Sequence, residues 1–460
     1  MPKPLSRSTL IFFAGPSIVF GMTHTASGSI LAGIYAKNFD ISLAALGTAM
    51  LMARVFDAIT DPLIGFLSDR TKSSWGARKP WVAAGTLLTI VSTYFFFIPV
   101  AEATAQYFMI SYMAITLAWT ICQIPTFAWQ AELSNEYHER ARVSAYRVIC
   151  DRLGRLAFAL IPLLPIFATT RVTLETVKAI FWLVLILAPI TLFFALWKVP
   201  IGTRIESKSG DKFIDFLKTI PQNKPMLLLL LITLLGGLAD GFFSSSIFFY
   251  IDVYLQKGEQ FPLILLLGQG SMLLTIPLTL SLMRRFGKHI IWALGMFVLS
   301  VAALLLLTIE PESSIISILI PIMMIYSGAA AGNVASYAIL ADVIDYDTLK
   351  TGHNRSGQYF AFSAILEKAN MAVGGAIAFY TLSWFGFNAQ ATVQTEMGDL
   401  GIKVAIAIMP CILSAIAIAI LFFFPLTEAK YKIIQRRLEQ RRVRMDQPLI
   451  GRTKKIQIGN

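Results

Sequence analysis

Two carboxylates lie one helical turn apart inside an apolar stretch of the sequence. The run 42–68 contains Arg54, Asp57 and Asp61. Residues four apart lie on one face of a helix, so Asp57 and Asp61 point in the same direction. Carboxylates stacked in this way either share a proton or bind a hard cation such as Na⁺. A structural ion pair between Arg54 and Asp57 is the alternative, and it leaves Asp61 unexplained.

A further charge lies deep in the apolar stretch 356–385, where Lys368 follows Glu367. A lysine near a helix end can extend its amine to the lipid headgroups, but Lys368 is well inside the stretch. A charge at mid-bilayer costs at least ~2.5 kcal/mol, so it usually has a functional or pairing reason. We expect Lys368 to pair with Asp57 or Asp61, or to contact a substrate.

The elements that position these charges must be membrane helices. Of 460 residues, 56% are hydrophobic and 14% are charged, and the mean hydropathy is +0.66. A soluble protein carries roughly 25% charged residues. Because each span needs roughly 20 apolar residues, the pattern predicts twelve helices. They cover residues 10–34, 42–68, 80–100, 107–131, 146–169, 175–197, 226–252, 261–283, 289–308, 313–341, 356–385 and 401–425.

A polar segment divides the predicted helices into six and six. We expect a first bundle at 1–197, a middle loop at 198–225, a second bundle at 226–425 and a basic tail at 426–460. Most lysines and arginines fall on the side of the termini, which predicts that both termini are cytoplasmic in a bacterial inner membrane. We expect the tail to contact anionic lipid rather than nucleic acid.

The two halves repeat a short pattern. Residues 131–137 and 142–144 of the first half match residues 341–346 and 355–357 of the second. Two six-helix halves with matched loops are typical of the all-α major facilitator fold, in which a substrate binds between the halves near the bilayer midplane.

The helix-2 region also resembles a known family. Residues 57–65, followed by 75–81, are similar to the glycoside–pentoside–hexuronide:cation symporters, the family of the melibiose carrier. Residues 131–147, 341–346 and 424–428 agree with it. The resemblance extends from helix 1 to helix 12, and it implies a cation site at Asp57, Asp61 and Thr120. The coupling ion would then be Na⁺, Li⁺ or H⁺.

The sugar-binding positions of that family transfer less well. The family has a sugar-binding carboxylate on helix 4, and Gln123 occupies its position in this sequence. The family's second carboxylate, on helix 1, aligns near Gly21, in a span that has no Asp or Glu. Trp129 is displaced by two residues from the stacking tryptophan. A pocket with few acids suits a hexuronide or another organic anion better than a neutral galactoside. The substrate residues implied are Gln123, Trp129, Arg147, Lys368 and His24, although His24 can also be a core residue.

Charged groups at the predicted cytoplasmic helix ends suggest a gate. We expect Asp69, Arg70 and Arg78 to pair with charges of the second half in the outward-facing state. Further pairs are expected of Glu132 with Arg142 and of Asp342 with Arg355 or Arg285. The alternative is that these charges only fix the topology. Asp151, Arg152 and Arg155 are expected to form local pairs near the start of helix 5.

Three functions stay open. The first is a cation-coupled symporter of a small solute, expected to be a monomer that needs no cofactor. The second is a lysolipid transporter on the same scaffold, and the third is a non-transporting sensor or assembly protein. The sequence has no Walker loop, no HExxH and no GxSxG motif, so we expect no enzyme.

Overall fold

The computed structural model describes residues 5–133, 137–202, 219–352, 355–426 and 428–446. Within these ranges the regular elements are helices. The first half contains α1 (Arg7–Ala14), α2 (Pro16–Ser27), α3 (Ser29–Phe39), α4 (Leu43–Arg70), α5 (Lys79–Phe97), α6 (Ala105–Leu133), α7 (Tyr137–Leu160) and α8 (Leu174–Lys198). The second half contains α10 (Lys224–Phe249), α11 (Phe261–Phe286), α12 (Lys288–Leu306), α13 (Ile315–Thr351), α14 (Ser356–Trp384), α15 (Glu396–Lys403) and α16 (Met409–Phe422), and α17 (Glu428–Asp446) follows.

Each predicted span overlaps these helices, but two are misplaced at their ends: the span 146–169 corresponds to α7, which covers Tyr137–Leu160, and the span 313–341 corresponds to α13, which continues to Thr351. Three spans are interrupted. The span 10–34 is divided at Gly15 and Gly28 into α1, α2 and α3. The span 401–425 contains a π-helical turn at Val404–Ile408, and the span 226–252 ends in another, which covers Tyr250–Tyr254. Apolar periodicity does not distinguish a continuous helix from one with an inserted turn, so the sequence could not predict these breaks.

Ten helices among the described residues are long and apolar enough to cross a membrane. The predicted spans outside this group are α7 and α14. Both carry charges in their middle turns: Asp151 and Arg152 in α7, Glu367 and Lys368 in α14. Charges within a spanning helix usually face the bundle interior or a water-filled cavity. These two spans are therefore the first candidates for helices that line a site.

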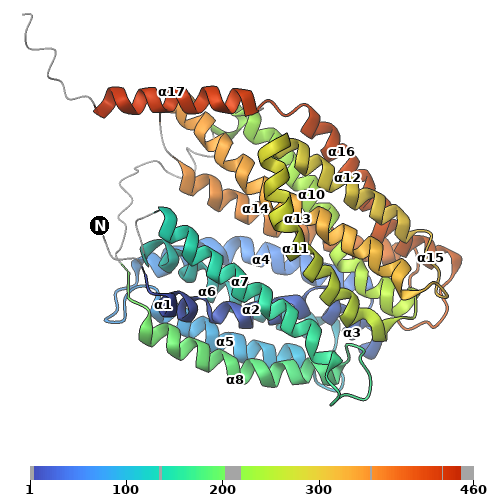
Figure 1. Ribbon diagram of the computed structural model, residues 1–460. Coiled ribbons are helices and arrows are strands. Elements are labelled where there is room, and N and C mark those ends of the chain that lie inside the picture. The colour runs from blue at the N-terminus through green and yellow to red at the C-terminus, as the bar shows by residue number, and fades with distance from the viewer. Residues whose placement is uncertain (1–4, 134–136, 203–218, 353–354, 427, 447–460) are drawn as a thin grey trace, which may run out of the picture.

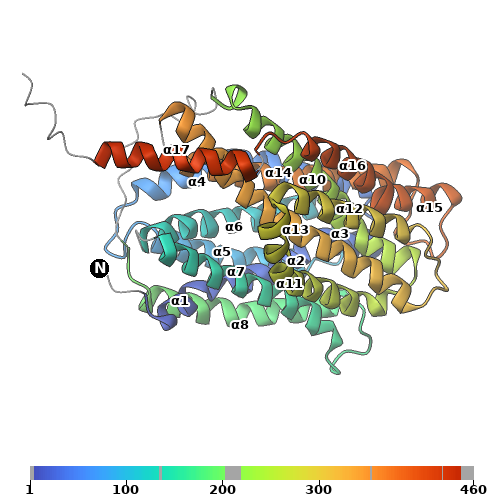
Figure 2. The same ribbon diagram turned by 45° about the horizontal axis from the view of Figure 1, so that its top comes forward.

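Two bundles make up the molecule (Figure 1). Helices α1 to α8 form one bundle and α10 to α16 form the other, with α4 of the first against α14 of the second. Helix α17 lies across one end, near the N-terminus, while α15 lies at the opposite end (Figures 1 and 2). These are called the α17 end and the α15 end below. Most of the expected middle loop, 203–218, lies outside the described residues.

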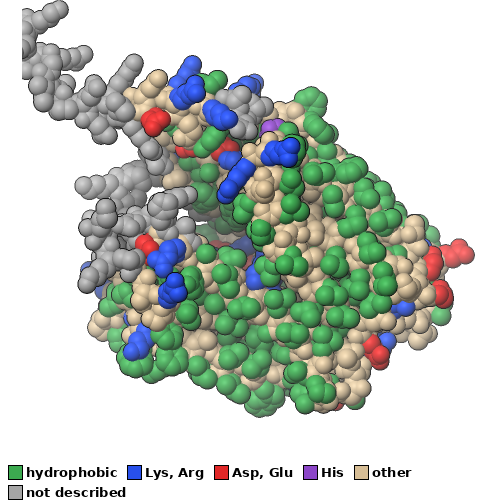
Figure 3. All heavy atoms as spheres, viewed as in Figure 1, with side chains coloured by type: hydrophobic (Ala, Val, Ile, Leu, Met, Phe, Trp, Pro, Cys, Tyr) green, Lys and Arg blue, Asp and Glu red, His purple; other side chains and the backbone are tan. Residues whose placement is uncertain are grey.

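The two halves are joined at the α15 end. Lys37 of α3 forms an ion pair with Asp252 at 2.5 Å between Nζ and Oδ2. The hydroxyls of Thr48 in α4 and Tyr380 in α14 lie 2.7 Å apart. Toward the α17 end the surface is hollowed between the halves, and basic side chains are visible within the hollow (Figure 3). The structure is therefore closed at the α15 end and open at the α17 end.

Candidate functional site

The α4 carboxylates have different surroundings. Asp57 is 9% exposed, and its Oδ2 accepts a hydrogen bond from Nη1 of Arg54 at 2.8 Å. Arg54 also donates to the hydroxyl of Tyr112 on α6 at 3.1 Å. The other carboxylate oxygen of Asp57, Oδ1, is buried and has no hydrogen-bond partner among the described residues. The ion pair with Arg54 therefore uses one of the two oxygens and leaves the second available.

Asp61 is contacted from both halves of the protein. Its Oδ1 accepts a hydrogen bond of 2.7 Å from Thr120 of α6, in the first half. Its Oδ2 lies 3.7 Å from Nζ of Lys368 on α14, in the second half. Of the two pairings considered for Lys368, the structure shows the one with Asp61. A threonine hydroxyl, a carboxylate and a second carboxylate one turn earlier thus lie at the contact between α4, α6 and α14.

In this conformation, which is open at the α17 end, the charged groups there pair within each half. The pairs between the halves were predicted for the outward-facing state and stay a prediction. Arg78 bridges Asp69 at 2.6 Å and Glu132 at 2.8 Å, all in the first half. Burial opposes the charge of Arg78, but its hydrogen bonds to Glu132 and Asp69 prevail and raise the pKa of its guanidinium. Glu132 is therefore paired with Arg78 rather than with Arg142.

The second half repeats this arrangement with a different partner from the one predicted. Asp342 of α13 pairs with Lys288 of α12 at 2.7 Å, and not with Arg355 or Arg285. The ion pairs Arg78–Glu132 and Lys288–Asp342 each join the start of one helix to the end of the next helix in the chain. The two halves therefore repeat this contact as well as the sequence pattern of their loops. The remaining predicted gate residues have local contacts: Arg142 bonds Glu139, Arg70 stacks on Phe66 and Arg285 on Phe286.

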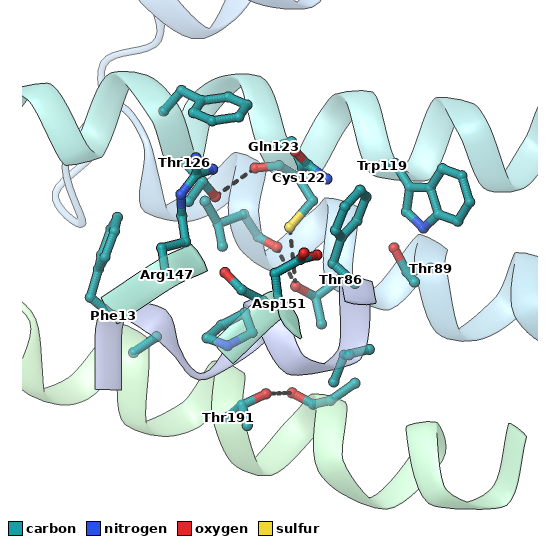
Figure 4. A pocket seen from close by; sticks show the side chains of 18 of the residues that line it. Phe13, Thr86, Thr89, Trp119, Cys122, Gln123, Thr126, Arg147, Asp151 and Thr191 are labelled. Atoms are coloured by element: carbon teal, nitrogen blue, oxygen red, sulfur yellow. Dashed lines mark hydrogen bonds between the residues drawn. The ribbon is translucent and has the colours of Figure 1, made fainter. Parts of the chain in front are cut away.

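A cavity of about 240 Å³ lies inside the first half, between α2, α5, α6, α7 and α8. Three of the residues expected to contact the substrate line it, namely Gln123, Trp129 and Arg147. Arg147 and Asp151 extend from α7 toward α6 and α5, whose Thr126 and Thr86 face them (Figure 4). His24 and Lys368 are not among the lining residues. Lys368 contacts the α4 carboxylates instead.

Trp129 and His24, two of the residues expected to contact the substrate, both have neighbours within the protein. Trp129 is 1% exposed, and its indole N–H donates to the carbonyl of Pro200 at 2.9 Å. The ring of His24 lies 5.4 Å from the ring of Trp119, which does line the cavity. Trp119, with its buried indole N–H, is therefore a second tryptophan on the cavity wall beside Trp129.

A group of charged residues on α7 lines the cavity without having been predicted as part of a site. Asp151 and Arg155 form the expected local pair, at 2.9 Å, but together with Arg152 they line the cavity. Two glycines allow this, because a Cβ at Gly21 would lie 2.1 Å from the Asp151 carbonyl oxygen and one at Gly154 would lie 2.0 Å from that of Ile18. The i, i+4 spacing of residues 147, 151 and 155, which places them on one helix face, was the available signal.

Comparison with known proteins supports the same architecture. A family model described as MFS/sugar transport protein matches residues 12–428. The glucuronide carrier protein homolog of Escherichia coli (strain K12) is 24% identical over 98% of this chain and 99% of its own length. The sodium-dependent lysophosphatidylcholine symporter 1-A of Danio rerio is 21% identical over 95% of this chain and 89% of its own length.

A solved structure agrees with the fold. A point mutant of the nucleoside transporter NupG superposes with a TM-score of 0.68 over 90% of this chain and all of its own, at 12% identity. The resemblance to a symporter family is thereby confirmed, as are the major facilitator fold and the expectation of a transporter rather than an enzyme. The chain belongs to the MFS/sugar transport protein family of multi-pass membrane transporters.

Proposed function

We propose that this transporter is a cation-coupled symporter of a small solute, namely a sugar, a hexuronide or a related organic anion, and that it works by alternating access. The observation that supports this most directly is the surroundings of Asp61. One carboxylate oxygen contacts Thr120 of the first half, and the other faces Lys368 of the second half. A ligand at Asp61 therefore acts on a contact between the two bodies that must move.

The cation site that we propose consists of Asp57, Asp61 and Thr120. A hard monovalent cation prefers oxygen ligands, and these residues offer carboxylate and hydroxyl oxygens, one of which is the unpartnered Oδ1 of Asp57. A cation at Asp61 competes with the ammonium group of Lys368 for the same carboxylate. Na⁺, Li⁺ and H⁺ can each play this role. The name of the Danio rerio relative, a sodium-dependent symporter, favours Na⁺.

The local charge balance favours an anionic solute. Asp57 and Asp61 are balanced by Arg54 and Lys368. A bound cation adds one positive charge to this group, at a depth where an uncompensated charge is costly. A solute with one negative charge restores neutrality, so cation and anion stabilise each other's binding. This is a physical route to coupling, because each ligand raises the affinity for the other by the same factor.

The open α17 end corresponds to an inward-facing state in this account. The predicted excess of basic residues on the side of the termini makes the α17 end cytoplasmic, with both termini inside a bacterial inner membrane. The Lys37–Asp252 pair then closes the outer side. Exchange between inward-open and outward-open states requires that the contacts at the α15 end break while new contacts form at the α17 end.

The size of the cavity is compatible with a small solute. Pockets for drug-sized ligands measure roughly 300–1,000 Å³, whereas the cavity in the first half has about 240 Å³. This volume accommodates a monosaccharide-sized solute. The lysolipid transporter and the non-transporting sensor are retained as outcomes of the experiment.

The test is uptake into proteoliposomes that contain the purified protein. We expect accumulation of a radiolabelled uronide, organic acid or sugar that depends on an inward Na⁺, Li⁺ or H⁺ gradient and is lost in Asp61→Asn. Asp399→Asn, at the α15 end and outside the site, is the matched control. Uptake of lysolipid alone would support the second function. Accumulation of no solute under any gradient would contradict the proposal.

A further inference from the structure

The cavity in the first half is unusual in the number of buried polar atoms that it leaves without partners. Among the described residues, Nε of Arg147, Oδ1 of Asp151 and Nε1 of Trp119 are buried, and none of them has a hydrogen-bond partner. All three residues line this one cavity. Buried polar groups are normally paired, so three unpaired atoms around one space call for a ligand that supplies the partners.

The chemistry of these atoms defines that ligand. Arg147 and Trp119 donate hydrogen bonds, so they need an acceptor such as a carboxylate or a hydroxyl oxygen. The free oxygen of Asp151 is an acceptor and needs a donor such as a hydroxyl group. A solute that carries both a carboxylate and neighbouring hydroxyls can satisfy both kinds of group. A simple fatty acid has the carboxylate but lacks the donor.

The cavity is also positively charged. Three arginines of α7 line it, at positions 147, 152 and 155, against the single carboxylate of Asp151. Arg155 is bound to Asp151 through its Nε at 2.9 Å. Arg147 is held over the ring of Phe127, with 4.0 Å from its Cζ to the ring centroid. These two arginines are therefore fixed by the protein before a ligand arrives.

Arg152 differs from its two neighbours. It lines the cavity, is half-buried, and makes no hydrogen bond or ion pair with the described residues. Asp240 of α10, in the second half, lies near enough to interact with it electrostatically. A half-buried guanidinium that has no ion pair favours an anion, and its two parallel N–H groups match the geometry of a carboxylate.

We propose that Arg152 and Asp151 of α7 determine the specificity of the transporter. Arg152 binds the carboxylate of a sugar acid, and Asp151 accepts a hydrogen bond from one of its hydroxyls. This proposal rests on the proposed function and adds to it the residues that read the solute. The sequence resemblance carried neither residue over as a substrate contact.

A matched pair of ligands separates the two roles. Methyl β-D-glucuronide and methyl β-D-glucoside share their ring hydroxyls and differ only by a carboxylate in place of a CH₂OH group. We expect the wild-type protein, with Na⁺ present, to bind the glucuronide at least tenfold more tightly than the glucoside. A site built around a polar group rejects an analogue that lacks it, because its own groups are then left unpaired.

The first variant is Arg152→Gln. It removes the charge without stranding an ion-pair partner, whereas a change at Arg155 would leave Asp151 without its partner. We expect glucuronide affinity to fall by about tenfold to a hundredfold, as for the loss of a hydrogen bond to a charged group, and glucoside affinity to stay within about twofold. Arg152→Lys should restore part of the preference. Arg284→Gln, an exposed arginine of α11, is the control and should change neither affinity.

The second variant is Asp151→Asn, which keeps an oxygen that can face Arg155. It should weaken both ligands by a similar factor, since they share their hydroxyls. A retained glucuronide preference in Arg152→Gln, or wild-type binding of neither ligand, overturns the inference. Stabilisation of the protein by Na⁺ alone, measured in the same samples, reports on the α4 site. If Na⁺ stabilises the protein but the ligand results are negative, only the roles proposed for Arg152 and Asp151 are wrong. If Na⁺ does not stabilise the protein, the proposed cation coupling is wrong.

Discussion

The ammonium group of Lys368 in α14 lies 3.7 Å from Oδ2 of Asp61 in α4, and this contact connects the two halves of the protein at the proposed cation site. The side chain of Lys368 is 47% exposed, whereas that of Asp61 is 15% exposed. A partly solvated lysine can leave its partner at low cost. The contact is therefore well suited to break when a cation takes its place at Asp61.

Lys368→Gln tests this competition. Removal of the ammonium group leaves Asp61 with Thr120 as its partner, so we expect Na⁺ to bind about threefold to tenfold more tightly. Because the contact between the halves is lost as well, solute accumulation driven by the Na⁺ gradient should fall. A Na⁺ titration by thermal shift gives the affinity. Lys403→Gln, whose partner Glu310 lies 3.9 Å away at the α15 end, is the control. Unchanged or weaker Na⁺ binding in Lys368→Gln would show that the lysine does not compete.

The closed α15 end makes a second prediction. Lys37 and Asp252 join α3 to the π-helical turn that follows α10. In a background without the three native cysteines, the double variant Lys37→Cys/Asp252→Cys should cross-link under oxidation. We expect cross-linking to abolish transport and a reductant to restore it, because the outer side can then not open. The variant Lys37→Cys alone should respond to neither treatment. Transport that continues through the cross-linked protein would contradict alternating access by separation of these helices.

The contact between α2 and α7 makes a third prediction, on stability. A Cβ added at Gly21 or Gly154 would lie 2.1 Å or 2.0 Å from a backbone carbonyl oxygen of the other helix. Gly154→Ala must therefore push the helices apart, and we expect it to lower the free energy of unfolding by about 1–3 kcal/mol. Gly270→Ala of α11 is the control, since nothing lies within 4 Å of its added Cβ. Equal melting temperatures in detergent for the two variants would show that this packing is not tight.

The ion pairs at the α17 end make a fourth prediction. Glu132→Gln leaves the buried guanidinium of Arg78 with Asp69 as its ion-pair partner. Breaking a buried pair typically costs about 3–5 kcal/mol, and we expect about 2 kcal/mol here because Asp69 remains. Because the pKa of Arg78 is raised, its pairing stabilises the fold up to pH values above the ordinary arginine pKa. The stability lost in Glu132→Gln should therefore be the same from about pH 6 to about pH 9. Denaturation across that range measures it, and a loss that disappears within the range would exclude this explanation.

The sequence predicted the architecture well because the bilayer restricts the choices. The all-helical membrane fold and the paired acids of α4 follow from helix length, hydropathy and i, i+4 spacing. The contact of Lys368 with Asp61 was expected as one of two pairings. The charged residues of α4 and α14 could be grouped in advance because charges within a membrane rarely lack a partner, whereas Thr120 of α6 was added to them only by the family resemblance.

The partners at the α17 end and the cavity residues could not be predicted in the same way. The sequence places Glu132, Arg78 and Arg142 at neighbouring helix ends, but the choice between Arg78 and Arg142 depends on how α5 and α7 sit against α6. The role of α7 depends on Gly21 and Gly154, which let its backbone approach α2 and turn Asp151 into the cavity. A glycine in an apolar run does not show by itself which helix it faces.

The most direct test of the account is the binding of cations to the purified protein and to three single variants. We expect Na⁺ or Li⁺, but not K⁺, to raise the melting temperature of the wild-type protein. At a hundredfold excess of the cation over its dissociation constant, the free energy of unfolding should increase by about 2.7 kcal/mol. Asp57→Asn and Asp61→Asn should lose this response. Asp240→Asn, which removes a carboxylate of α10 outside the site, should keep it. A response that survives in both α4 variants, or that is lost equally in all three, would contradict a cation site at Asp57 and Asp61.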